Sequence, residues 1–337
     1  MKKPMTVACL AVAFVASSAA PGAAALKLSL KISGGAAMLL DGAGDLDRFR
    51  QGQKALADDW ARDDFRTATF NWKKMSTVPE LGGEVILHVS PKLGIGLGVG
   101  YLAARAKADY ATHYNQSWSL AWGDFVETET YAVKRDIRAW AIPISLNLHV
   151  LTRLSGRFNF TAQAGVAYYL GKLKQTCDVT DNYFYGYDSD DYYDQKAYYD
   201  ESATTTDTAA CNTFGFQGAA GLEMLLTPAL SVGFEIYGRY VDFKGFKGDS
   251  NYTATSRERF WHEVFGWWYD ETTTSADSET GGLYYWEWRS NYYNRDYATL
   301  GIREEAPAGP GVRGARRATI NMNRVGVLIT LRYRFDL

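Results

Sequence analysis

The sequence predicts an all-β fold, an eight-stranded antiparallel transmembrane up-and-down β-barrel with four long extracellular loops and short periplasmic turns. Eight segments alternate apolar and polar residues with a period of two, which is typical of strands that separate lipid from a polar interior. The connections between the segments alternate between short and long, as expected when hairpins cross a membrane. The last segment, 319–336, is the clearest, because its apolar side is unbroken: Val325, Val327, Ile329, Leu331, Tyr333 and Phe335.

The eight segments and their connections can be placed along the chain. The segments are 26–38, 83–89, 93–104, 138–150, 158–170, 214–226, 230–243 and 319–336. Short turns are expected on the periplasmic side at 90–92, 154–156 and 227–229. Long loops are expected outside the cell at 41–82, 105–137, 171–213 and 244–318. An even number of strands returns both termini to the periplasm.

The N-terminus has the pattern of a secretory signal peptide at 1–25, which leaves 26–337 as the barrel domain. Lys2 and Lys3 precede an apolar stretch at 5–16, and small residues at 23–25 fit a cleavage site. That stretch is too short to be a spanning helix. These features predict a protein of the outer membrane of a Gram-negative bacterium.

Aromatic residues, 15% of the chain, gather where the expected strands would cross the two membrane interfaces. A spanning strand needs about 9–11 residues. Counted from the short turns, the rings of one group therefore reach the outer interface: Tyr101, Trp140, Tyr168 and Tyr240. The rings of a second group stay at the inner interface: Phe158, Phe160, Tyr333 and Phe335. Two such girdles are expected of a membrane-spanning sheet.

Charges of both signs fall on the side of the strands that faces the interior. We expect them to form a charge network in the lumen: Glu84, Glu223, Glu235, Arg239, Arg332 and Arg334. An unpaired buried charge is costly, so these groups should pair with one another and plug a narrow barrel. An alternative is a narrow porin-like channel for small solutes or ions.

The strand pattern, the signal peptide and the ending Leu-Arg-Tyr-Arg-Phe at 331–335 resemble the small OmpA/OmpX-type outer-membrane barrels. The hairpin at 221–235 is also similar to hairpins of that family. The resemblance implies a monomer whose last strand, through Tyr333 and Phe335, is the assembly signal for the barrel-assembly machinery. The chain departs from the family in carrying Asp336 and Leu337 after Phe335. The resemblance implies the architecture and leaves the function open.

The expected third loop holds two candidate sites. Cys177 and Cys211 are the cysteines left after signal cleavage, and an even count in an exported protein suggests a disulfide, with two free thiols as the alternative. Asp188, Asp190 and Asp194 are weak candidates for Ca²⁺ ligands. Tyr192 occupies the next ligand position of such a loop, so the alternative is a hydrated acidic loop without a metal. We expect no other cofactor.

The expected fourth loop carries a candidate binding surface of tryptophans: Trp261, Trp267, Trp268, Trp286 and Trp288. Rings among polar residues are typical of adaptable binding surfaces. Three alternatives stay open: the rings cap the barrel, they rest on lipopolysaccharide, or the segment is a hairpin outside the membrane. Arg313, Arg316 and Arg317 are candidates for contact with lipopolysaccharide phosphates.

The expected first loop contains a helical pattern instead. Leu46, Phe49, Leu56 and Trp60 recur at helical spacing, which predicts a helix of one to three turns over the barrel mouth.

No residue set indicates catalysis. The chain has four histidines, and neither the His88-x-Ser90 spacing nor His262 comes with a recognisable partner. A net charge of −2 gives no reason to expect nucleic acid as a partner. We therefore expect a non-enzymatic outer-membrane protein that anchors an aromatic-rich extracellular cap, for envelope integrity or surface binding and adhesion. Its expected partners are outer-membrane lipids, lipopolysaccharide and an unknown extracellular ligand. The remote alternative is a lipid-modifying enzyme.

Overall fold

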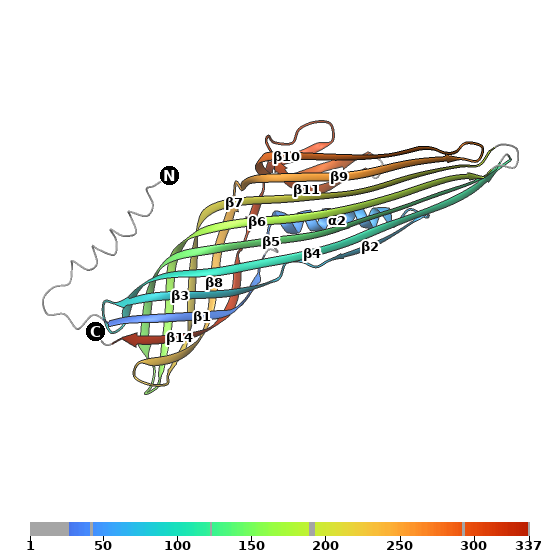
Figure 1. Ribbon diagram of the computed structural model, residues 1–337. Helices are drawn as coiled ribbons and strands as arrows, with labels where there is room; N and C mark the ends of the chain where they lie inside the picture. Colours follow the sequence, from blue (N-terminus) through green and yellow to red (C-terminus); the bar gives the residue numbers. More distant parts are fainter. Residues whose placement is uncertain (1–26, 41–42, 122, 189–192, 292–293, 336–337) are drawn as a thin grey trace.

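The computed structural model describes residues 27–40, 43–121, 123–188, 193–291 and 294–335, and it contains fourteen strands and one α-helix (Figure 1). The predicted signal peptide at 1–25 lies outside these residues. Within them, no helix combines the length and the apolar character that crossing a membrane requires.

The elements follow one another along the chain. They are β1 (Lys27–Leu39), α2 (Asp45–Trp60), β2 (Arg66–Trp72), β3 (Thr77–His88), β4 (Leu93–Leu120), β5 (Gly123–Arg153), β6 (Phe158–Asp188), β7 (Gln195–Leu225), β8 (Leu230–Lys244), β9 (Lys247–His262), β10 (Gly266–Ser290), β11 (Arg295–Arg303), β12 (Val312–Arg317), β13 (Thr319–Asn321) and β14 (Arg324–Phe335).

Eight antiparallel strands pair in a cycle, which we call the ring. Its order is β1, β3, β4, β5, β6, β7, β8, β14 and back to β1. The tight turns predicted at 90–92, 154–156 and 227–229 are confirmed, since each joins two neighbouring strands of the ring. Leu28 pairs with Phe335, so the described ends of the chain lie side by side.

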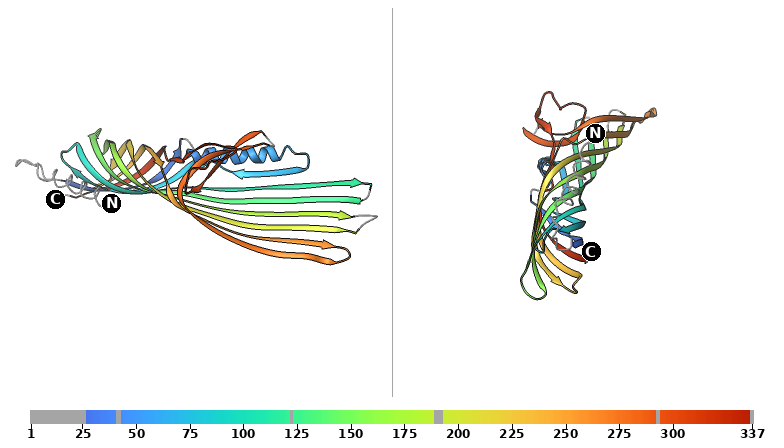
Figure 2. Two further views of the ribbon diagram at one scale, coloured as in Figure 1. Left: turned by 90° about the horizontal axis from the view of Figure 1, so that it is seen from above. Right: turned by 90° about the vertical axis from the view of Figure 1, so that its left-hand side faces the viewer.

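The prediction of an eight-stranded barrel with four long loops is wrong. The chain forms one sheet of fourteen strands, and six of them lie outside the ring. β4 to β7 are 28 to 31 residues long, roughly three times the 9–11 residues that span a membrane. Figure 2 shows the long strands leaving the ring as an open, curved sheet, which we call the extension.

The four expected loops are therefore secondary structure. The described residues of the segments 105–137 and 171–213 belong to the continued strands β4, β5, β6 and β7. The segment 41–82 contains α2, β2 and the start of β3, and 244–318 contains β9 to β12. Expected strands such as 93–104 and 158–170 end where the outward residues of the sequence become polar. A strand persists there because water can solvate that side while the backbone ladder continues.

Where the ring passes into the extension, the outer strands change their pairing partners. β7 pairs with β8 from Gly215 to Leu225 and with β9 from Gln195 to Ala210. Gly245, at φ +80°, makes the turn by which the chain leaves β8 for β9, a backbone conformation that suits glycine. On the opposite edge, β4 pairs first with β3 and then with the short strand β2.

The predicted alternation of faces within the ring is confirmed by burial. On β14, Ile329 is 66% exposed, whereas the neighbouring Thr330 is 5% exposed. The same alternation holds on β5, where Leu148 is outward and Asn147 is buried. The outward side of the ring is apolar, and the inward side is polar or small.

The helix predicted in the segment 41–82 is confirmed, but at 16 residues it is longer than expected. It lies along one face of the extension (Figures 1 and 2). Phe49 is buried, packs edge-on against Trp72 at 5.4 Å, and lies beneath the Arg135 guanidinium, 4.6 Å from its ring centre. A Cβ on Gly52 would come within 2.5 Å of the Ala298 nitrogen, so this glycine permits close approach of α2 and β11.

The largest apolar core of the described residues belongs to the extension. It joins Leu46 and Phe49 of α2 to the inward side of β4, β5 and β6 and to β10 and β11. An open sheet with one apolar face must cover that face, and α2 with β11 does so here. The helix is also held at its first turn, where Arg316 donates to Asp45 through two contacts of 2.6 Å.

We predict that Phe49→Ala lowers the free energy of unfolding by about 3 to 5 kcal/mol, because it leaves a cavity beneath α2. Urea unfolding of the refolded protein in detergent micelles, followed by tryptophan fluorescence, measures the change. Phe65→Ala is the matched control, since Phe65 is 48% exposed. Equal losses in the two variants would contradict this account of the core.

Candidate functional site

The space inside the ring is crossed by ion pairs. Lys31 on β1 reaches Glu235 on β8 at 2.8 Å and donates to Gln163 at 3.0 Å. Glu84 on β3 accepts from Asn147 at 2.7 Å and lies 2.9 Å from the His149 ring. These six side chains come from different strands or different levels of the ring, so the contacts tie its opposite walls together.

Two further carboxylates complete this network. Glu223 lies between Arg332, at 2.8 Å, and Arg334. Glu80 accepts a hydrogen bond of 2.5 Å from the Tyr237 hydroxyl and also contacts Arg239 and Arg324. The structure thus places the six predicted lumen residues, Glu84, Glu223, Glu235, Arg239, Arg332 and Arg334, on the inward side with charged or polar partners.

Sequence reasoning missed Glu80 and Arg324. Glu80 fell within the expected loop 41–82, although it shares the two-residue phase of Glu84 and this signal was available. Arg324 is completely buried, 3.3 Å from Glu80. A cavity of about 40 Å³ remains beside this network, and the core of the extension lies beyond it. The described interior is therefore occupied largely by charged and polar side chains that contact one another.

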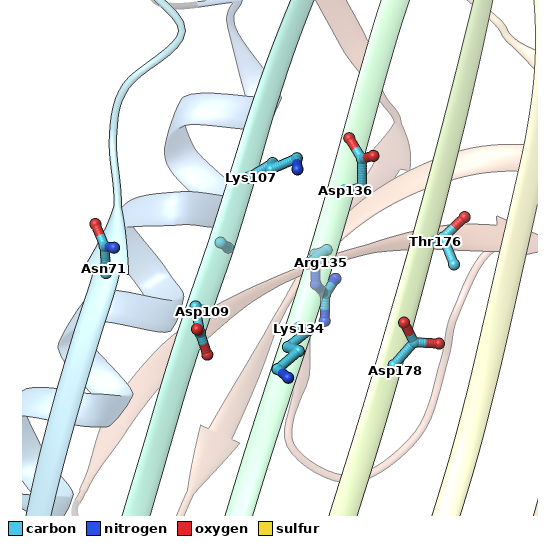
Figure 3. Close-up of a pocket in the computed structure, with 9 residues that line it drawn as sticks. Asn71, Lys107, Asp109, Lys134, Arg135, Asp136, Thr176 and Asp178 are labelled. Atoms are coloured by element: carbon cyan, nitrogen blue, oxygen red, sulfur yellow. The ribbon is translucent and has the colours of Figure 1, made fainter.

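A larger hollow of about 520 Å³ lies on the outward face of β2, β4, β5 and β6 (Figure 3). Its polar lining includes Lys107, Lys134, Asp109, Asp136 and Asp178. Alternation along the strands brings these side chains to one face, because each pair on a strand is separated by two residues. The sequence does not predict the hollow, because the segments 105–137 and 171–213 are expected from it to be loops.

Asp136 is the most strongly held group of this face. Arg105 donates to it at 2.9 and 2.5 Å, and Arg138 donates at 2.8 Å. These hydrogen bonds, above all those from Arg105, hold the pKa of the Asp136 carboxyl well below its usual range. One carboxylate therefore serves two guanidinium groups.

An exposed aromatic cluster, which we call the tip, lies at the turn between β9 and β10, far from the ring (Figure 1). Phe265 is 69% exposed and Trp268 is 65% exposed, and their ring centres are 5.9 Å apart. His262 is buried beside them and accepts the Val264 backbone N–H at 3.2 Å. The tip also includes Trp267 and Tyr269, both exposed.

The five tryptophans predicted as one binding surface do not form one surface. Trp261, Trp267 and Trp268 lie at or beside the tip, whereas Trp286 and Trp288 lie at the opposite end of β10. Trp286 is buried under the Arg303 guanidinium, 5.8 Å from its ring. Long strands separate residues that would be neighbours in a compact loop.

The predicted disulfide is contradicted. Cys177 and Cys211 are both free and buried. Cys177 pairs with Thr205, and Cys211 pairs with Gly171, so the two cysteines lie roughly 20 Å apart along the hairpin. A disulfide needs Cα atoms within about 7 Å. Burial among Tyr110 and Val133 raises the pKa of the Cys177 thiol.

The remaining candidates are the predicted calcium ligands, the arginines predicted to contact lipopolysaccharide, and His88. Asp190 lies outside the described residues, among which no group of three or more His, Cys, Asp or Glu side chains could hold a metal. The arginines proposed for lipopolysaccharide are engaged within the protein: Arg316 by Asp45, Arg313 by Asp296 at 3.4 Å, and Arg317 over the Tyr284 ring. His88 shares a 2.8 Å hydrogen bond with the Ser29 hydroxyl rather than with Ser90.

Comparison with known proteins gives no family. No family model and no curated relative matches the chain. Among solved structures, the outer membrane protease OmpT from Escherichia coli is similar at 8% identity and a TM-score of 0.27, over 92% of this chain and 97% of that one. The siderophore receptor PirA from Pseudomonas aeruginosa is similar at 8% identity and a TM-score of 0.10, over 92% of this chain and 80% of that one. Similarity at this level assigns neither fold family nor activity, and the expected family membership stays a prediction.

We predict that Glu80→Gln lowers the free energy of unfolding by about 3 to 5 kcal/mol, because Arg324 and Arg239 lose their buried counter-charge. Urea unfolding in micelles measures the loss. Asp270→Asn is the control, since it removes a carboxylate from the exposed pair with Arg257 and should leave the midpoint unchanged within error. A Glu80→Gln variant as stable as the wild type would refute the role given to this pair.

We predict that both thiols of the protein lacking residues 1–25 are reduced and shielded. Burial and a raised pKa leave little reactive thiolate, so Cys177 should react with Ellman's reagent at pH 8 at least roughly tenfold more slowly in the folded protein than in the unfolded one. Unfolding without reductant should release two thiols. If none appears until reductant is added, the free cysteines of the structure are wrong.

Proposed function

We propose that this chain is a non-enzymatic outer-membrane protein whose ring lies in the bilayer and whose extension presents a binding surface outside the cell. The outward side of the ring supports the first half. Its large apolar residues are 37% exposed at Leu170 and up to 73% exposed at Phe214. Burying such surface is worth about 25 cal/mol per Å², so a continuous apolar belt favours lipid over water.

The strand ends support one orientation. The tight turns and the two described chain ends lie at the same end of the ring, which we assign to the periplasm, and the extension then faces outward. Tyr333 and Phe335 lie edge-on at 4.8 Å near the end of β14, where the barrel-assembly machinery would read them. The filled interior favours an anchor over a conduit, because each buried charge near its centre faces a partner.

The exposed tip is the single observation that carries the binding role. Exposed contiguous rings are unusual on a protein surface and mark sites of interaction. Trp and Tyr contribute large contact areas at low cost in conformational entropy, which suits them to recognition. The tip offers rings rather than a paired acid and base, since His262 is held by a backbone N–H. The partner we propose is a surface molecule that stacks on rings.

The extension is suited to carrying such a tip. From Lys172, near the edge of the apolar belt, β6 continues for 16 residues to Asp188, roughly 55 Å at about 3.4 Å per residue. Every long strand in it is paired over most of its length, so it is a stiff arm rather than a set of mobile loops. The envelope role and the surface-binding role are therefore compatible, with the ring serving one and the tip the other.

We predict that the double variant Phe265→Ser, Trp268→Ser loses attachment. Gram-negative cells that display the wild-type chain would be tested for retention on arrays of immobilised glycans and extracellular-matrix proteins. The variant should lose at least roughly tenfold of the retention on any surface that the wild type binds, because the anchoring rings are removed.

Trp288→Ser is the matched control, since Trp288 is 48% exposed but lies at the far end of β10. It should retain full attachment, and heat-modifiable migration on gels should confirm folding of all three proteins. Equal retention of wild type and tip variant, or no retention by either, counts against the proposed binding role.

A further inference from the structure

Four cations lie on the outward face where the extension begins, and three of them are level with one another. Arg105 on β4 is directly opposite Arg138 on β5, and Arg138 is directly opposite Lys174 on β6. Lys172 lies one outward position nearer the ring on β6, opposite Trp140. We call Arg105, Arg138, Lys172 and Lys174 the basic row. Side chains directly opposite each other on one face have Cβ atoms about 5 Å apart.

The basic row is not neutralised within the described chain. Like charges in opposite positions destabilise a sheet, so such a row needs counter-ions. Asp136 supplies one carboxylate, shared by Arg105 and Arg138. Lys172 and Lys174 make no ion pair among the described residues. The other carboxylates of this face, Asp109 and Asp178, lie farther from the ring.

The place of the row along the strands indicates its counter-ion. Two residues before Lys172 is Leu170, the last residue of β6 in the apolar belt, and two residues beyond Arg138 toward the ring is Trp140. One step on a single face is about 7 Å. If the ring is embedded as proposed above, the basic row therefore lies at the depth of the lipid headgroups of the outer leaflet.

The hollow lies directly beyond the basic row. Its volume of about 520 Å³ is within the usual range of roughly 300–1,000 Å³ for small-molecule sites. Asn71, Lys107, Thr176 and Asp178 line it with donors and acceptors of the kind that sugar hydroxyls require (Figure 3). A cationic row next to the membrane and an adjoining polar hollow bring a phosphate-binding set and a sugar-binding set side by side, as a lipid whose sugar carries a phosphate requires.

We infer that the outward face of β4, β5 and β6 is a binding site for one phosphorylated saccharide lipid of the outer leaflet, the lipid A part of lipopolysaccharide. The basic row holds a phosphate, because guanidinium and ammonium groups form charge-assisted hydrogen bonds to phosphate oxygens. The adjoining hollow receives the sugar that carries this phosphate. This inference rests on the proposed placement of the ring in the outer membrane, and it names a lipid partner that is separate from the ligand of the tip.

The test compares Lys172→Gln, Lys174→Gln with the wild type. Both lysines lack a protein partner, so the double variant should fold. Purified protein in detergent would be titrated with bisphosphorylated lipid A, with dephosphorylated lipid A and with inorganic phosphate, and bound lipid would be counted by native mass spectrometry. Wild type should bind the bisphosphorylated form at least roughly tenfold more tightly than the dephosphorylated form, and the variant should lose that preference.

Lys196→Gln, Arg257→Gln is the matched control, since it removes two cations from β7 and β9, roughly 40 Å and roughly 27 Å beyond Lys174 along the extension. It should bind lipid A as the wild type does. Equal affinity of the wild type for both lipid A forms would overturn the inference, as would saturation by inorganic phosphate alone.

Insertion of the wild type into phospholipid vesicles without lipid A, measured by heat-modifiable migration and by quenching of tryptophan with brominated lipid, tests the membrane placement by itself. Insertion together with equal binding of both lipid A forms would reject the glycolipid site and keep the proposed function. Failure to insert would reject both.

Discussion

The backbone hydrogen-bond ladder of β4 to β7 is the constraint on which the rest of the structure depends. Backbone groups have no water to bond in a bilayer, so strands within it must be paired on both sides. The same strands continue for more than a dozen residues beyond the apolar belt without a break in pairing. One ladder therefore runs through both the ring and the extension, and only the side chains change between them.

The inward face changes in the opposite sense. Within the ring it is polar, and pairs such as Lys31 with Glu235 satisfy charges that have no access to bulk water. Beyond the ring the outward face is wet, so the inward face becomes the apolar one, as the series Ala104, Ala106 and Ala108 on β4 shows. That inversion explains why α2 and β11 are needed where the ring ends. An open sheet with an apolar face folds only when another element covers it.

The same inversion explains how far the sequence could predict the structure. The alternation from Val325 to Leu331 predicted the outward and inward faces correctly, because every outward residue in it is large and apolar. Beyond Leu170 the outward residues of β6 are Lys172, Lys174 and Thr176. These polar residues suggest a loop, although the strand continues to Asp188. The basic row and the hollow were missed for that reason, whereas Glu80 was missed because the expected strand began only at Gly83. The even count of cysteines suggested a disulfide between Cys177 and Cys211, but the β6–β7 hairpin holds the two residues at different levels, where both are free.

The open edge of the extension poses a problem that the ring does not have. From Trp267 to Ser278, β10 is exposed and pairs on one side only, with β9. A long bare edge invites pairing with another copy of the chain. Here the edge carries Asp270, Glu271 and Asp277, so a second copy aligned along it would bring carboxylates together. The charge pattern disfavours fibres and sheet-to-sheet dimers, and this allows a single stiff arm to hold its rings in solvent at the tip without closing the sheet.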